Sequence, residues 1–196
     1  EGVIRQPLFI ECNRIAAFKP RGTDVSVTLD MMIHDIDMIQ YLVKSPISEV
    51  DAAGAPVFSG EEDIVNARLH FENGCIANVT ASRISMKNER KMRIFQHDAY
   101  LMIDFVNKKV LVARKGEGEM LPGVPKIDVD EHTYKDEDIL EREIDAFLTS
   151  IAEGRPPLVS GEDGRLALET ALLINESLKL HASRSQAFGG TQAPSG

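Results

Sequence analysis

Apolar residues recur along the chain with two different spacings, and each spacing predicts a different kind of element. Runs in which every second residue is apolar predict β-strands, whereas apolar residues three or four positions apart predict helices. The predicted strands are residues 8–15, 47–58, 63–71, 75–84, 91–95, 99–105, 108–114 and 127–134. The predicted helices are residues 29–43, 138–153 and 165–182.

The clearest strand pair surrounds the dipeptide Asn73-Gly74. Two alternating runs flank this dipeptide, which is a strong signal for a β-hairpin. One side of the first run is apolar and the other side is polar, so we expect a sheet with one buried face and one open, polar face. The apolar positions are Val65, Ala67, Leu69 and Phe71, and the polar positions are Asn66, Arg68, His70 and Glu72.

Glycine, proline and capping residues predict where the elements end. The first helix should stop near Ser45-Pro46, because proline disfavours helical backbone in the residue before it. Ser160 and Asp163 resemble a capping box at the start of the last helix. Residues 116–126 contain Gly and Pro and predict a long loop or an exposed excursion.

The last part of the chain has a different composition. Gly, Ser, Gln and Pro dominate residues 183–196, which predicts a disordered tail. Residues 1–182 are therefore predicted to form one domain. The sequence does not begin with Met, and its first residues resemble the end of a helix, so we expect a fragment or a processed chain.

The helix at residues 29–43 carries the most distinctive chemistry. Asp30 and His34 are four residues apart, so in a helix they share one side. A carboxylate beside an imidazole can fix its tautomer and leave the other ring nitrogen to exchange a proton. Two other interpretations stay open: a surface His beside an acid, or a metal site of Asp30, His34 and Asp37.

Composition and charge narrow the classes of partner. The chain has a formal net charge of −9, which argues against a general nucleic-acid or anionic-membrane surface. No apolar run is long enough to span a membrane. The two cysteines, Cys12 and Cys75, sit in strand-like runs and predict buried thiols in a reducing compartment, so we expect a cytoplasmic protein.

Three stretches give the chain a family resemblance. These are LDMMIHDID at residues 29–37, NARLHFENG at residues 66–74, and SGEDG at residues 160–164. Together they resemble the C-terminal domain of the glucose-fructose oxidoreductase/inositol dehydrogenase (Gfo/Idh/MocA) family of NAD(P)-dependent oxidoreductases. The loop FKPRGTD at residues 18–24 resembles the branch that oxidises the 3-hydroxyl of UDP-N-acetylglucosamine.

The resemblance implies an α+β fold with an open, mainly antiparallel sheet and helices packed on one face. Such a domain is similar to the C-terminal domain of glyceraldehyde-3-phosphate dehydrogenase. In this family a preceding Rossmann domain binds the dinucleotide and supplies a lysine from a Glu-Lys-Pro motif. Neither that motif nor a Gly-x-Gly-x-x-Gly fingerprint occurs here, so the resemblance implies a substrate-binding and dimerisation half that is inactive alone.

The resemblance also implies roles for individual residues. His34 would take the proton from a sugar hydroxyl, Asp30 would orient His34, and NAD or NADP would accept the hydride. Lys19, Arg21 and Arg83 are candidate contacts for an anionic sugar nucleotide, although ordinary surface charge explains them as well. We expect a homodimer or homotetramer formed through the sheet face, without nucleic-acid or membrane partners.

A second hypothesis comes from the open sheet face. A polar sheet face can pair with its twin, so the domain could be a non-catalytic dimerisation or ligand-sensing module. Ligand-induced stabilisation would distinguish the two hypotheses.

Overall fold

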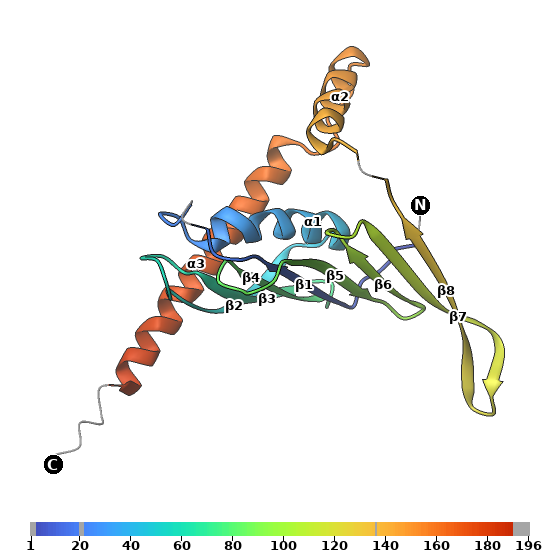
Figure 1. Cartoon of the computed structure of the whole chain (residues 1–196), viewed down its shortest axis with the longest axis horizontal. Helices are drawn as coiled ribbons and strands as arrows, with labels where there is room; N and C mark the ends of the chain where they lie inside the picture. The colour runs from blue at the N-terminus through green and yellow to red at the C-terminus, as the bar shows by residue number, and fades with distance from the viewer. Residues whose placement is uncertain (1–2, 20–21, 136, 190–196) are drawn as a thin grey trace.

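The computed structural model describes residues 3–19, 22–135 and 137–189, with side chains up to residue 183. Its centre is an eight-stranded open sheet in the order β2-β3-β4-β1-β5-β6-β7-β8 (Figure 1). Neighbouring strands are antiparallel except β1 and β4, which are parallel. The strands are β1 (Phe9–Ile15), β2 (Ile47–Ala55), β3 (Ile64–Phe71), β4 (Ile76–Ser82), β5 (Glu89–Phe95), β6 (Ala99–Asp104), β7 (Lys109–Leu121) and β8 (Val124–Thr133).

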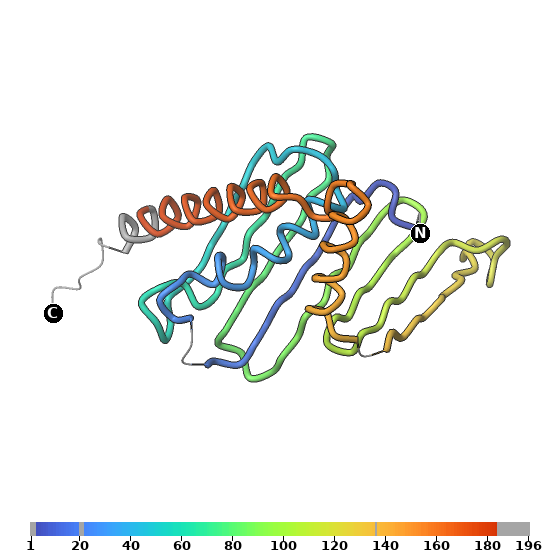
Figure 2. Tube along the Cα trace, turned by 90° about the horizontal axis from the view of Figure 1, so that it is seen from above, coloured from blue at the N-terminus to red at the C-terminus, as the bar shows by residue number. Residues whose placement is uncertain are grey.

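Helices lie on one face of this sheet and leave the other open (Figures 1 and 2). A short π-helical turn, η1 (Thr28–Met32), leads directly into α1 (Ile33–Val43). The long helix α3 (Gly161–Gly189) lies beside α1, where Gln40 Nε2 donates a 3.0 Å hydrogen bond to Thr170 Oγ1. The predicted α+β class is therefore confirmed. None of the helices in the described part of the chain has the length and apolarity that a membrane span requires.

The core lies between the sheet and these two helices. The predicted inward residues of β3 are all buried, and from α1 Ile36 and Ile39 are fully buried against the sheet. The buried side chains of β3 are Val65, Ala67, Leu69 and Phe71. Cys12 and Cys75 are free and buried, as the strand pattern predicted.

The predicted elements are present, and the differences in extent that matter most concern β2, the β7–β8 hairpin and α3. β2 ends at Ala55, before Pro56, instead of continuing to residue 58. Of the two structures predicted for residues 116–126, the exposed excursion is present and the loop is not, because β7 and β8 continue through this segment as a long exposed hairpin (Figure 1). α3 extends to Gly189, into the segment predicted as a tail, and residues 190–196 of that prediction lie outside the described residues.

The helix α2 (Ile139–Ala152) differs from α1 and α3 in its surroundings. Asp138 caps its first turn by accepting hydrogen bonds from the N–H groups of Leu140 and Glu141. Figure 1 shows α2 standing away from the sheet. Its apolar stripe is exposed, from 50% at Ile144 to 74% at Ile139. The predicted amphipathic pattern is present, but the described chain does not bury its apolar side.

Candidate active site

The helical segment from Thr28 to Val43 presents one side to the sheet and one side outward. Ile36, Ile39 and Val43 anchor the inner side in the core. Asp30 and His34 both lie on exposed positions. The two candidate catalytic residues are therefore accessible, on an element whose opposite side is rigidly packed.

Asp30 and His34 do not hydrogen-bond to each other in the structure. The reason lies in the local backbone, because Asp30 belongs to the π-helical turn and His34 to the α-helix that follows. The N–H of Ile33 bonds to the carbonyl of Thr28, five residues back, which changes how successive turns stack. The regular helix assumed in the sequence analysis does not hold across this pair.

The Asp30 carboxylate instead lies beside the preceding loop. A Cβ atom placed on Gly22 would be 3.6 Å from Asp30 Oδ2, and Gly22 itself has a positive φ of 70°. Lys19 lies exposed in the same loop, whereas Arg21 lies outside the described residues. The loop that carries Lys19 therefore lies next to Asp30. The substrate contact predicted for Arg21 stays a prediction.

Asp37 is a further acidic residue near His34, which the sequence had suggested only as a metal ligand. It follows His34 by three positions in regular α-helix, so the two side chains are neighbours. Burial raises the pKa of Asp37, the negative charge of Asp163 raises it further, and the charge of His34 opposes both. Asp37 is therefore a carboxylate close enough to His34 for the two charges to interact. The i, i+3 spacing was the available signal.

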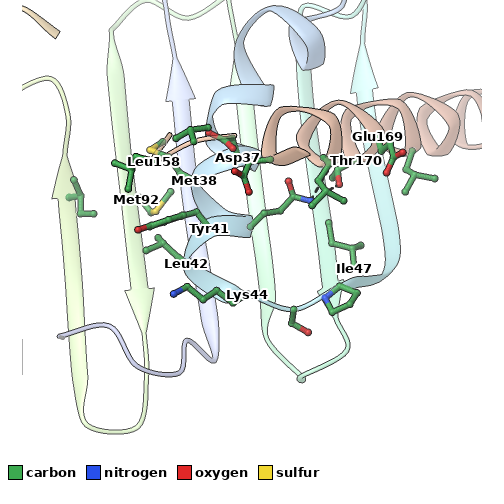
Figure 3. Close-up of a pocket in the computed structure, with 18 of the residues that line it drawn as sticks. Asp37, Met38, Tyr41, Leu42, Lys44, Ile47, Met92, Leu158, Glu169 and Thr170 are labelled. Atoms are coloured by element: carbon green, nitrogen blue, oxygen red, sulfur yellow. Dashed lines mark hydrogen bonds between the residues drawn. The ribbon is translucent and has the colours of Figure 1, made fainter. Parts of the chain in front are cut away.

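A cavity of about 900 Å³ opens on the side of α1 that carries Asp37 (Figure 3). Its wall is mostly apolar and comes from α1, from β5 and β6, and from the start of α3. Asp37, Asp163 and Glu169 add acidic groups to this wall, and His34 is not part of it. Figure 3 shows Tyr41 and Met38 of α1 projecting toward Met92 of the sheet.

Arg83 has a different role from the one predicted. It is 4% exposed, and its Nε donates a 2.7 Å hydrogen bond to Asp63 Oδ1. Its other donors serve carbonyl and hydroxyl oxygens of the adjoining loops, which leaves none of its five N–H groups for a substrate. The prediction that Arg83 contacts the substrate is therefore not supported by the geometry. The acceptors are the carbonyls of Gly22, Val25 and Glu62 and the hydroxyl of Ser59.

Asp63 explains why this arginine is buried. Its carboxylate accepts hydrogen bonds from the backbone N–H groups of Val57, Phe58 and Ser59 as well as from Arg83. Burial alone would raise the pKa of Asp63, but these hydrogen bonds hold it well below its usual range. The pair fixes the loop on which Gly22 meets Asp30.

Asp35, directly after His34, points into the protein. It is fully buried and accepts two hydrogen bonds from Arg14 of β1, from Nε to Oδ2 at 2.6 Å and from Nη2 to Oδ1 at 2.7 Å. Arg90 of β5 approaches the same carboxylate, with Nε 3.9 Å from Oδ1. The helix that carries His34 is thus tied to two strands by an ion cluster around one buried carboxylate.

The metal interpretation of this region finds no matching geometry. Among the described residues, no group of three or more His, Cys, Asp or Glu side chains is arranged to hold a metal ion. Asp30 lies against the Gly22 loop, and Asp37 lies toward the cavity. Asp30, His34 and Asp37 therefore lie in different surroundings and do not form one site.

The described residues also contain no element suited to a dinucleotide. A dinucleotide site needs a glycine-rich turn between a strand and a helix of a parallel unit. The one parallel pair in the described sheet, β1 and β4, is not joined by such a turn.

Comparison with known proteins identifies the kind of domain. Residues 13–101 match the family model described as the GFO/IDH/MocA C-terminal domain. The chain is 34% identical over 178 residues to a UDP-N-acetylglucosamine 3-dehydrogenase of Acidithiobacillus ferrooxidans, covering 91% of this chain and 56% of that relative. It is 27% identical over 160 residues to a myo-inositol 2-dehydrogenase of Thermotoga maritima, covering 78% and 47%.

Solved structures give the same result. The UDP-N-acetylglucosamine 3-dehydrogenase of Acidithiobacillus ferrooxidans superimposes with a TM-score of 0.82 at 34% identity, over 89% of this chain and 56% of that one. A levoglucosan dehydrogenase in complex with NADH and levoglucosan shares the fold, with a TM-score of 0.76 at 18% identity over 92% and 59%.

The open sheet with helices on one face is the architecture shared with these solved structures. The chain belongs to the Gfo/Idh/MocA family. It spans about half the length of the curated relatives it matches.

Proposed function

We propose that this chain is the substrate-binding and catalytic-base half of an NAD(P)-dependent oxidoreductase acting on a sugar or sugar-nucleotide hydroxyl. The 3-hydroxyl of UDP-N-acetylglucosamine is the substrate position we favour, because the relative with 34% identity over most of the chain is named for that reaction. The observation that carries the proposal is the exposed His34 with an acid on either side of it along an anchored helix.

The chemistry explains why such a histidine is needed. Oxidation of an alcohol to a ketone removes a hydride from carbon and a proton from oxygen. An imidazole can both take up and release a proton at a ring nitrogen, so the exposed His34 can accept the hydroxyl proton and later release it to solvent. His34 is therefore the general base in this proposal.

The two neighbouring acids have separate parts. Asp37, adjacent to His34 on α1, stabilises the imidazolium that forms when the proton is taken. Asp30, held beside the Gly22 loop, is placed to orient the sugar or to pass the proton outward. Lys19 and Arg21 of that loop are proposed to contact the diphosphate, for which a planar guanidinium is well suited.

NAD or NADP would supply the hydride acceptor when bound. We assign its site to the part of the natural protein that this chain does not span, because the described residues lack a dinucleotide fingerprint. The relatives' length leaves room for such a part, since the chain covers 56% of the first of them. The two buried, free thiols suit a reducing compartment, and we propose a cytoplasmic location.

The apolar side of α2 is proposed to pack against that cofactor-binding part. Exposed apolar faces of this size are normally covered in the working assembly. Leu140, Ile144, Phe147 and Leu148 are each at least 50% exposed here.

The proposal is tested in the natural full-length protein with UDP-N-acetylglucosamine and NAD⁺ or NADP⁺. We expect His34→Ala and Asp30→Asn each to lower turnover by about a hundredfold or more, the usual scale of general acid–base catalysis, without loss of folding. His97→Ala is the matched control, since His97 lies on the surface in a turn between β5 and β6. Turnover close to that of the native protein in His34→Ala would remove the pair from the mechanism.

A second candidate function rests on the open sheet face. Side chains there pair across strands, as in the 2.8 Å bond from Asn66 Nδ2 to Thr80 Oγ1 and the 2.8 Å ion pair of Arg93 with Glu11. Such an ordered polar face suits self-association, so a dimerisation or ligand-sensing module without catalysis is the alternative.

A further inference from the structure

Asp35, the residue after the proposed base His34, attaches the helix α1 to the sheet. Asp35 is fully buried, and Arg14 donates a hydrogen bond to each of its carboxylate oxygens in a bidentate contact. Such a contact fixes the direction of the carboxylate as well as its distance, because the guanidinium is planar and rigid. The orientation of the first turn of α1 about its own axis is thereby tied to β1.

A second guanidinium completes the cluster. Arg90 of β5 lies with its charged group 4.5 Å from the centre of the Phe105 ring, and its buried Nε has no hydrogen-bond partner. The nearest carboxylate oxygen is that of Asp35, at 3.9 Å. Burial and the charge of Asp35 raise the pKa of the neighbouring Cys12 thiol, which keeps that group neutral. Two strands therefore converge on one carboxylate.

Stability alone is a poor explanation for this arrangement. Removing a carboxylate from water is costly, and apolar residues of similar volume often stabilise a core as well or better. The position of the cluster is more informative. Asp35 lies in the first turn of α1, directly after the π-helical turn, where the backbone changes its hydrogen-bonding pattern. A change of pattern at this point would rotate His34 about the helix axis.

We infer that Asp35 and Arg14 are positioning residues, which set the direction in which His34 faces its substrate. This inference rests on the proposed function, because it needs His34 to be the base. Asp35 and His34 are adjacent, so they point in directions about 100° apart around a helix. Fixing Asp35 under the helix fixes His34 on its exposed side. A shift of about 1 Å in a catalytic group can cost on the order of a hundredfold in rate.

The test measures kcat and KM in the natural full-length protein with UDP-N-acetylglucosamine and NAD⁺ or NADP⁺. Asp35→Asn removes the charge but keeps the shape, and Arg14→Lys keeps the charge but loses the two-pronged contact. We expect both to lower kcat by about ten- to a hundredfold with KM changed less than about twofold. A residue that only stabilises the fold would leave kcat of the folded protein unchanged.

A double variant guards against misfolding. Asp35→Leu with Arg14→Met removes both charges of the pair and fills the site with apolar groups. Arg90 loses its nearest carboxylate, but its side chain is 34% exposed and keeps access to solvent. The double variant is therefore expected to fold and to show the same loss of kcat. Asp104→Asn is the control, because Asp104 is also buried and lies 3.6 Å from Lys91 in the sheet. It should lower the melting temperature and preserve kcat.

The outcomes separate this inference from the proposed function. A folded double variant, or Arg14→Lys, with the kcat of the native protein would overturn the positioning role. An equal loss of kcat in Asp104→Asn would also overturn it, since the effect would then follow stability. A His34→Ala variant with native turnover would instead overturn the proposed function itself.

Discussion

Asp63 stabilises two loops through the hydrogen bonds that its carboxylate accepts. Its carboxylate gathers three backbone N–H groups and the side chain of Arg83, and Arg83 in turn binds the loop that reaches Asp30. One buried ion pair therefore connects β3, β4 and the loop beside the candidate site.

We predict that Asp63→Asn destabilises the fold by about 3–5 kcal/mol, the usual cost of leaving one member of a buried ion pair unpaired. The hydrogen bonds hold the pKa of Asp63 below its unfolded value near 4, so its contribution is complete above that pH and is lost as the pH falls. Urea unfolding from pH 7 to pH 3 measures both effects.

The native protein should lose stability over that range more steeply than the Asn variant does. Asp128→Asn is the control, because the Asp128 side chain is about half exposed and pairs with Lys126 at the surface. It should change stability by no more than about 0.5–1 kcal/mol. Equal sensitivity to acid in native and Asp63→Asn protein would contradict the assignment.

The residue types in the sequence indicated which side chains could take part in chemistry, but not which interaction partners those side chains have in the folded protein. Asp30 and His34 both lie on exposed positions of the predicted helical segment, and their catalytic roles stay predictions. The π-helical turn between them could not be predicted, because the apolar spacing fits an ordinary helix equally well. Arg83 was misassigned for a similar reason, since its partner Asp63 is 20 residues away and meets it only through the sheet.

At the level of elements, patterns with one buried side were predicted well and exposed ones poorly. β3 and β4 matched their alternating pattern and the Asn-Gly turn. Most of the β7–β8 hairpin was predicted as strands at residues 108–114 and 127–134, but its outer part was not, because nearly all side chains there are exposed and no alternation marks them. Gly116 suggested a loop, but it lies within β7, where its missing side chain lets Asp128 of β8 come close to the backbone. A Cβ atom on Gly116 would lie 2.6 Å from Asp128 Oδ2.

We predict that α2 has the least protected backbone of the helices with described side chains. Its side chains other than Ser150 are outside the core, whereas α1 buries Ile36 and Ile39 completely. Local opening should therefore be easier in α2, and its amides should exchange with deuterium faster than those of α1. Hydrogen-exchange mass spectrometry of the chain measures this directly.

The same measurement on the full-length protein tests the proposed packing of α2. Exchange in α2 should slow there by an order of magnitude or more if the cofactor-binding part covers it, because burial raises the free energy of local opening. Exchange in the β7–β8 hairpin serves as an internal reference. Equal exchange of α2 in both forms would contradict the proposed packing.

For the whole molecule, the two faces of the sheet divide the proposed tasks. The covered face carries α1 and its candidate catalytic residues, and the open face carries paired polar groups beside an aromatic cluster. The cluster consists of Phe9, Phe95 and Tyr100, with ring centroids 5.8 Å and 5.1 Å apart between neighbours. Self-association through this face would leave the His34 side accessible.

We therefore predict that light scattering finds a dimer or tetramer and that Phe95→Asp dissociates it. Phe95 is 37% exposed on the open face, and a charge buried there in the interface would be unpaired. Val106→Asp, at the exposed turn after β6, is the control and should not change the mass.

Thermal melting with UDP-N-acetylglucosamine then distinguishes a substrate-binding domain from a non-catalytic interaction module. A substrate-binding domain is stabilised as ligand exceeds its Kd, by about 2.7 kcal/mol at a hundredfold excess. An oligomer with no such shift would favour the interaction module.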